Sequence, residues 1–373
     1  MAMGAAERIV WPDTVKGLSI LWIVYFHAFR SFADSRYPWP LDDGFVAQVC
    51  EQTHSAGLGC IARAAFFGFS SLGFHAVGVF IVLSGFALAF SVTRRNTPIA
   101  WRGWYRSRLL RLFPLYWTAH LIYLVSPSQV HIEAIDYRFI LSFLGDRVVP
   151  LTTIFYYANA AWWYFGLLLE LYLVFPLLHM LRERLGTRWF LVASAAITMV
   201  SRYLILIVWP SEYSGAFLLG ALFTCRLFEF TVGIVLGAAY ARARVATEAR
   251  LLSPMAALAG IVLYTAGLYA NDGLLLYVFA DGLIGCGLLL IMANVAKWLE
   301  RIPLIQSPLA RVGFYSYGLY LLHQPYMIWL GHSMQGRELP TFVVIAIVAT
   351  AVLALLSMAI ERSVNTAVAR VLG

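Results

Sequence analysis

Charge is scarce in this sequence, because Asp, Glu, Lys and Arg together make up only 12% of its 373 residues. Soluble domains carry roughly twice that share, so this chain has too little charge to cover a soluble surface of its size. Apolar residues reach 61%, the mean hydropathy is +0.76, and aromatic residues make up 15%, which also excludes a disordered chain. The remaining class is a membrane protein with several spans.

Several motifs are missing as well. The sequence has no C-x-x-C pair, no H-E-x-x-H motif, no clear repeat and no linker rich in Pro or Ser. No metal site is therefore predicted, and residues 1–373 are expected to form one membrane domain. Cys50 and Cys60 share one segment between spans, where a disulfide and ordinary burial are both open, while Cys225 and Cys286 are expected to pack inside spans.

Long apolar runs account for most of the chain. A helix needs about 20 mostly apolar residues to cross a bilayer. The sequence predicts an all-α, polytopic helical bundle of about ten spans, at residues 17–33, 72–92, 112–127, 158–181, 189–209, 215–240, 252–270, 274–294, 313–331 and 340–361. Two segments between spans, 34–71 and 128–157, are long and rich in aromatic residues, and we expect them to form re-entrant or interfacial structure.

The basic residues predict which side of the membrane each segment faces. Of the 27 Lys and Arg, 19 lie in segments on the side of the termini, and the other eight lie in the opposite segments or inside spans, Arg202 and Arg226 among the latter. Cytoplasmic loops of membrane proteins carry the excess of Lys and Arg. Both termini are therefore predicted to be cytoplasmic, and the net charge of +8 is assigned to this asymmetry rather than to nucleic-acid binding.

Ionisable residues inside spans are few, and their default interpretation is functional because charge in a bilayer is costly. Arg226 and Glu229 are three residues apart on one predicted helix, so they can neutralise each other. A structural ion pair and a substrate role are both open for them. Arg202 and Asp281 are candidates for a second pair, between helices.

The first span carries two polar residues at a helical spacing. Lys16 and His27 are eleven residues apart, which is about 16 Å or three helical turns, so both project from nearly the same face. This face would offer an anchor for an anion at the cytoplasmic surface and a proton acceptor beyond the middle of the membrane. A histidine that is merely satisfied by a neighbour is the alternative.

The segment 93–111 concentrates arginine next to aromatic residues. Guanidinium groups form forked hydrogen bonds that suit phosphate oxygens, so this segment is a candidate phosphate-binding patch. A positive-inside signal without further function is the alternative. Its basic residues are Arg94, Arg95, Arg102, Arg106, Arg108 and Arg111, interleaved with Trp101, Trp104 and Tyr105.

These elements, in this order, resemble the acyltransferase 3 family of integral membrane acyltransferases. The first span matches that family's basic residue and His with ten residues between them, although Lys16 stands where Arg is more common. Five more segments match in order, at residues 78–86, 105–117, 163–176, 226–233 and 316–325. The spacing around Glu170 is shorter than in the family, so Glu170 matches only approximately.

The resemblance, which runs from residue 8 to about 362, implies the transfer of an acyl group, usually acetyl. The donor would be cytoplasmic acyl-CoA, and the acceptor would be a hydroxyl of a glycan or similar small molecule. It implies a multi-pass protein of the cytoplasmic membrane, bacterial in origin, with no permanently bound cofactor. Many relatives carry an added SGNH domain, and this chain resembles the stand-alone members.

Under this hypothesis His27 is the general base, with Glu170 or Asp13 as its partner. Ser84 or Tyr320 would donate a hydrogen bond to the oxyanion. Direct transfer and a covalent acyl-His intermediate are both open. The predicted donor site comprises Lys16, Tyr105, Arg106, Arg108 and Arg111. The predicted acceptor or structural site comprises Asp13, His75, Ser84, Arg226, Glu229, Tyr320 and His323.

Two other classes of function compete with the enzyme. About ten spans with buried charges also suit a transporter or flippase for an anionic lipid or solute, although the sequence shows no inverted repeat and no paired broken helices. A non-catalytic scaffold or sensor is the third class. The sequence leaves open the acceptor, the length of the acyl chain and the oligomeric state.

Overall fold

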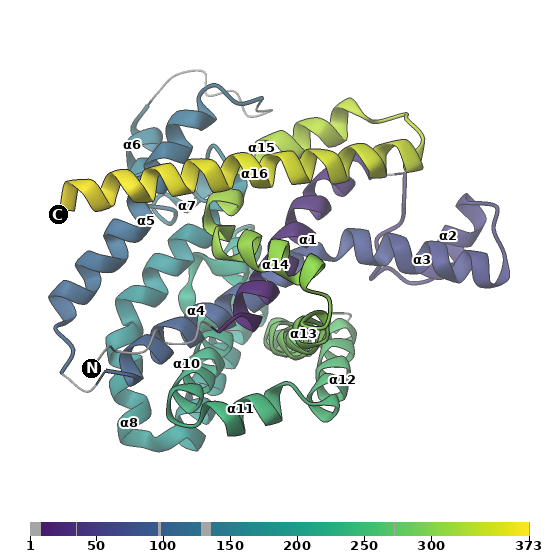
Figure 1. The fold of residues 1–373 in the computed structure, drawn as a ribbon. Helices are drawn as coiled ribbons and strands as arrows, with labels where there is room; N and C mark the ends of the chain where they lie inside the picture. Colours follow the sequence, from purple (N-terminus) through teal and green to yellow (C-terminus); the bar gives the residue numbers. More distant parts are fainter. Residues whose placement is uncertain (1–8, 35, 96–97, 128–135, 272, 373) are drawn as a thin grey trace.

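Helices form nearly all regular structure in the computed structural model, which describes residues 9–34, 36–95, 98–127, 136–271 and 273–372 (Figure 1). The longer helices are α1 (Trp11–Ala33), α3 (Gly57–Ser71), α4 (Ala76–Thr93), α5 (Trp101–Tyr123), α8 (Trp163–Tyr203), α10 (Leu227–Arg242), α12 (Pro254–Ala270), α13 (Tyr277–Leu299), α14 (Pro303–Phe314), α15 (Ser316–Ser333) and α16 (Leu339–Leu372). The shorter ones are α2 (Phe45–Gln52), η1 (Gly73–His75), α6 (Tyr137–Phe143), α7 (Leu151–Ile154), η2 (Ala160–Trp162), η3 (Leu204–Val208), α9 (Ser214–Ala216), η4 (Phe217–Ala221), η5 (Phe223–Arg226) and α11 (Arg244–Leu251). Over these ranges there is no strand, so the predicted all-helical fold is confirmed.

Five helices in the described ranges are long and apolar enough to cross a membrane, or up to six if the bent pair α11–α12 is one span. Helices lie over all ten predicted segments. However, α1, α5 and α15 are not among the five, because each carries charged or strongly polar residues along its length. The count of about ten spans and the side of the termini therefore stay predictions.

Two predicted boundaries differ from the structure, those of α5 and of the span 215–240, whereas the boundary inside α8 agrees with it. Helix α5 begins at Trp101, ahead of the predicted start at residue 112, so most arginines of segment 93–111 lie on a helix. Helix α8 is broken at Gly186 (φ 73°, ψ 163°), between two predicted spans. The predicted span 215–240 is divided into α9, η4, η5 and α10, with a left-handed residue at Gly220 (φ 159°).

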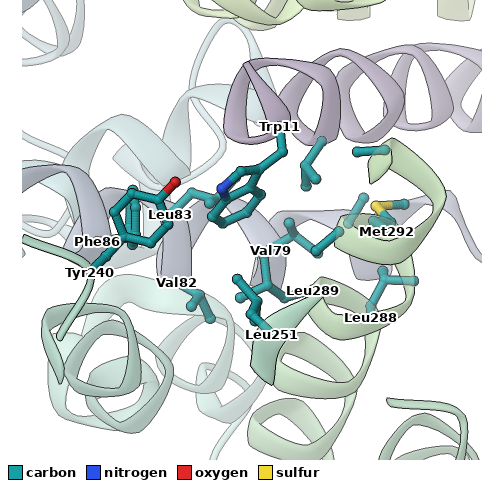
Figure 2. Packing of buried hydrophobic residues seen from close by; sticks show 14 of the residues in the cluster. Trp11, Val79, Val82, Leu83, Phe86, Tyr240, Leu251, Leu288, Leu289 and Met292 are labelled. Atoms are coloured by element: carbon teal, nitrogen blue, oxygen red, sulfur yellow. The ribbon is translucent and has the colours of Figure 1, made fainter. Parts of the chain in front are cut away.

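The core is built where α4 and α10 cross at very short range. A Cβ atom on Gly85 would lie 2.1 Å from the carbonyl oxygen of Phe230, so only glycine permits this contact. Beside this crossing, the Trp11 ring of α1 packs against the rings of Phe86 and Tyr240, with centroids 5.6 Å and 6.3 Å away (Figure 2). Apolar side chains of α4 and α13 complete the cluster, which ties the start of α1 to the body of the bundle.

Helix α1 is fixed along its length by two other close approaches. A Cβ atom on Gly17 would lie 2.1 Å from the Leu309 carbonyl oxygen of α14, and one on Gly331 of α15 would lie 2.4 Å from the Ala28 carbonyl oxygen. These contacts set the depth and rotation of α1 at both ends. They therefore place the side chains of Lys16 and His27.

The two long segments between spans contain helices, α2 and α3 in the first and α6 and α7 in the second. A disulfide between Cys50 and Cys60 links α2 to α3, which decides the question that the sequence leaves open. Residues 128–135 of the second segment lie outside the described residues. In its remainder Arg147 is buried, and its guanidinium donates to the Ser142 hydroxyl (2.6 Å) and the Tyr157 carbonyl oxygen (2.7 Å).

Candidate functional site

A cavity of about 490 Å³ lies inside the bundle, between α1, α4, α5, α8, α15 and α16. Lys16 and His27 both line this cavity, so it extends along α1 between them. Because these residues are eleven apart on one helix, the cavity is about 16 Å long at least. Its two ends differ in chemistry.

The first end is basic. Lys16, Arg94, Arg108 and Arg111 line it, and Asp13 and Glu361 are the acidic residues there. The Lys16 ammonium lies 2.8 Å from the Asp13 carboxylate, and the Glu361 carboxylate accepts a hydrogen bond from the Gly318 amide (2.7 Å) at the start of α15. Four cations against two carboxylates leave this end with net positive charge.

The second end holds two imidazoles, of His27 and His323, whose ring centroids are 5.1 Å apart. His323 is fully buried, and its Nδ1 lies 2.8 Å from the Tyr320 carbonyl oxygen and 3.2 Å from that of Leu319. A carbonyl oxygen only accepts, so Nδ1 carries the proton in the neutral ring. The Nε2 atom of His323 has no partner in the described chain, which leaves an acceptor beside His27.

Polar side chains around the imidazoles are held by their own hydrogen bonds. The Tyr320 hydroxyl donates to the Ala161 carbonyl oxygen (2.5 Å) and accepts from the Phe165 amide (3.1 Å). The hydroxyls of Ser84 and Tyr164 share a hydrogen bond of 3.2 Å. Because the Tyr320 proton is already committed, the Ser84–Tyr164 pair is the better source of a hydrogen bond to an oxyanion than Tyr320.

Three residues predicted for catalysis or donor binding lie outside the cavity. Glu170, predicted as a partner of His27, does not line the cavity, and its carboxylate accepts a hydrogen bond from the Phe223 amide (3.0 Å). The Tyr105 hydroxyl donates to the Leu173 carbonyl oxygen (2.7 Å), and Arg106 is exposed. The structure therefore does not bring Glu170 to His27, and it leaves Tyr105 and Arg106 out of the basic end.

A network of buried charges forms a separate cluster. The Arg226 guanidinium lies 2.9 Å from both Glu229 and Asp281, and the Arg202 guanidinium donates to Asp281 at 2.5 Å. The two predicted ion pairs are thus present, joined through Asp281. Near them, His75 is hydrogen-bonded to the Tyr264 hydroxyl (3.0 Å). None of these residues lines the cavity. This favours the structural role for Arg226 and Glu229, and it does not support the predicted place of His75 in an acceptor site.

Sequence reasoning missed other residues of the cavity. Gln324 lines it beside His323, and its side-chain oxygen accepts a hydrogen bond from the Ala161 amide (2.8 Å). Tyr164 and Tyr172 line it from α8, and Glu361 from α16. The signal for Gln324 was its position directly after a histidine in an apolar span. Nothing in the sequence separates the two tyrosines from other aromatic residues of α8.

The described part of the chain is thus a helical bundle with helices suited to span a membrane and with an internal cavity that joins a cationic end to paired imidazoles. Residues 9–361 match the acyltransferase domain model of the acyltransferase 3 family, and the chain belongs to this family. It is similar to "Acyltransferase MdmB" of Streptomyces mycarofaciens, with 26% identity over 292 residues, which cover 72% of each chain. No solved structure matches the chain. The protein is thus a membrane acyltransferase.

Proposed function

We propose that this protein transfers an acetyl group, or another short acyl group, from cytoplasmic acyl-CoA to a hydroxyl of an extracytoplasmic or membrane-associated glycan or similar acceptor. The observation that carries the proposal is the single cavity along α1, with cations at one end and His27 and His323 at the other. Acyl-CoA has the matching polarity, because its phosphates are separated from its thioester by a long, thin pantetheine arm.

The basic end suits the pyrophosphate of the donor. Lys16, Arg94, Arg108 and Arg111 would bind the phosphate oxygens, and Asp13 would hold the Lys16 ammonium in place. The arm would then follow α1 inward. The distance of about 16 Å from Lys16 to His27 suits its length and would bring the thioester to the imidazoles.

The chemistry follows from the position of His27. A ring nitrogen of His27 takes the proton of the acceptor hydroxyl while the hydroxyl oxygen attacks the thioester carbonyl carbon. The C–S bond then breaks, and the imidazolium returns the proton to the leaving thiolate, so that the products are the ester and free CoA. The free Nε2 of His323 is suited to accept a hydrogen bond from the other ring nitrogen of His27 and to hold it in the productive tautomer. His323 thereby takes the place that the sequence assigned to Glu170.

The location and partners follow from the same proposal. The protein would be a multi-pass protein of the bacterial cytoplasmic membrane with both termini inside, where acyl-CoA is available. The basic end would open to the cytoplasm, and the acceptor would approach from the outer side. Acyl-CoA is a consumed substrate in this scheme, and no permanently bound cofactor is required.

Acceptor-dependent release of CoA tests the proposal. Purified protein in lipid nanodiscs would be given acetyl-CoA with a panel of hydroxylated glycans and small molecules, and free thiol would be measured together with the mass of the acylated product. We expect CoA release only with an acceptor, and none from H27A. H332A is the matched control, because His332 lies on α15 but does not line the cavity. Movement of an anionic lipid or solute across the membrane without release of CoA would instead support the transporter.

A further inference from the structure

A second hollow of about 730 Å³ lies between α14, α16 and the residue that precedes α1. Phe314 lines this hollow and also lines the cavity described above. The two share further borders, because Val10 and Arg362 of the second hollow directly follow Ile9 and Glu361 of the first. The second hollow therefore adjoins the basic end of the cavity.

The second hollow carries unneutralised positive charge. Arg311 of α14 and Arg362 of α16 line it, and no acidic residue does so among the described residues. Both arginines are exposed, and in the described part of the chain neither guanidinium forms an ion pair. By contrast, the basic end of the cavity contains Asp13 beside its cations. Two free guanidiniums from different helices are suited to one phosphate monoester.

We propose that this hollow binds the 3′-phosphoadenosine end of the CoA donor, an inference that rests on the proposed function. Arg311 and Arg362 would bind the 3′-phosphate, and the adenine would stack on Phe314 or Tyr315 at the border of the two hollows. The side-chain amide of Gln306 would face the polar edge of the base.

The arrangement of the donor requires such a site. If the pantetheine arm fills the cavity and the pyrophosphate lies at Lys16, Arg108 and Arg111, the ribose and base must lie outside the mouth. The shared residue Phe314 shows on which side of the mouth a hollow is available. Its volume is ample for one nucleoside phosphate. The two sets of cations then bind different phosphates of the same molecule.

Two donors that differ only in the 3′-phosphate test the inference, namely acetyl-CoA and acetyl-3′-dephospho-CoA. For the wild type we expect the KM of the dephospho donor to be about tenfold higher, the effect of losing one charged hydrogen bond. R362A and R311A should raise the KM for acetyl-CoA by a similar factor and leave the KM for the dephospho donor unchanged. R108A should raise both values equally, because it acts on the pyrophosphate. R370A, farther along α16, is the matched control.

Direct binding gives a readout that does not depend on turnover. Adenosine 3′,5′-bisphosphate should bind the wild type about tenfold more tightly than adenosine 5′-monophosphate in calorimetry, and R362A should remove the difference. If both nucleotides bind equally, or if R362A raises the KM of both donors by the same factor, the inference is wrong while acyl transfer from acyl-CoA stands. A wild type that releases no CoA with any acceptor contradicts the proposed function instead, and the nucleotide titration still decides the inference.

The phosphate of an anionic lipid in the inner leaflet would also suit these two arginines. A further experiment distinguishes a lipid site from a nucleotide site. R311A and R362A would be compared with the wild type for retention of phosphatidylglycerol through purification, measured by native mass spectrometry. We expect no difference between them. Loss of the lipid together with unchanged nucleotide binding would overturn the inference and make the hollow a lipid site.

Discussion

At the scale of single residues, the two imidazoles of the cavity are held in different ways. His323 is locked by its Nδ1 proton on two backbone carbonyl oxygens, whereas His27 has no hydrogen bond in the described chain and packs edge-on against Phe26, with ring centroids 5.0 Å apart. A residue that must gain and lose a proton needs free nitrogens. A residue that only orients the base benefits from a fixed tautomer. His27 therefore suits the base, and His323 suits the positioning role.

H27A should abolish acyl transfer and leave expression and membrane insertion intact. The reason is that the imidazole faces a cavity and forms no hydrogen bond in the described chain, so its loss removes the base without breaking a contact of that kind in the fold. The measurement is acceptor-dependent CoA release by the purified variant, with its elution profile as the check on folding. Activity above a few per cent of wild type would show that another group is the base.

H323N should lower kcat by at least about tenfold, with a much smaller effect on the KM for acetyl-CoA. The asparagine side chain keeps a donor near the carbonyl oxygens but does not reproduce the Nε2 acceptor beside His27. Because the donor phosphates bind at the other end of the cavity, their contribution to KM should persist. The pH profile of kcat should also change, since His27 loses its hydrogen-bond acceptor. A uniform rise in KM with unchanged kcat would contradict this assignment.

Lys16 and His27 both line the cavity, in the relation that their spacing predicts. Lys16 and His27 lie on the same helix, so their relation follows from the helical repeat alone. Glu170 was misplaced because its helix face depends on which neighbour α8 packs against. In the structure Tyr164, Leu168 and Tyr172 face the cavity at four-residue intervals, and Glu170 is about 200° around the helix from Leu168.

At the scale of elements, three of the helices that line the cavity are hard to recognise as spans, whereas α4, α8 and α16 line it and are apolar enough to be recognised. In α1, α5 and α15, polar or charged residues that line the site stand where a typical span has apolar residues. None of the three helices is therefore apolar enough to count as a span by hydropathy. The sequence located these helices through flanking apolar residues and motifs. The break at Gly186 falls between the predicted spans 158–181 and 189–209, as the sequence predicts. The divided segment before α10 was missed, because hydropathy averages over a window and is insensitive to a single glycine with positive φ.

G17A should destabilise the protein and weaken donor binding together. The added Cβ would lie 2.1 Å from the Leu309 carbonyl oxygen, so α1 must separate from α14 and carry Lys16 with it. Overpacking of this kind costs about 1–3 kcal/mol. G103A is the matched control, because a Cβ there meets nothing within 4 Å and alanine is the better helix former. Thermal unfolding in detergent should show a lower Tm for G17A alone, and an equal Tm for the two variants would contradict the close contact.

At the scale of the whole molecule, the basic residues of the cavity and of the second hollow lie at the same end of the bundle. The basic end of the cavity and the hollow around Arg311 and Arg362 lie at the ends of α1, α5 and α16 that the sequence assigns to the cytoplasm. The imidazoles lie deeper, toward the end of α15 that continues into the segment before α16. A donor from one side and an acceptor from the other therefore meet at His27 only if this orientation is correct.

Cysteine labelling tests that orientation directly. Cys225 and Cys286 would be replaced, and the Cys50–Cys60 disulfide, which does not react with maleimides, would be kept. We expect A100C and A246C, both at exposed positions of predicted cytoplasmic segments, to react with an impermeant maleimide only after the cells are permeabilised. D43C and E338C, at exposed positions of the opposite segments, should react in intact spheroplasts. The reversed pattern would place the basic end away from cytoplasmic CoA, and a transporter of an anionic solute would then explain the cavity better than acyl transfer.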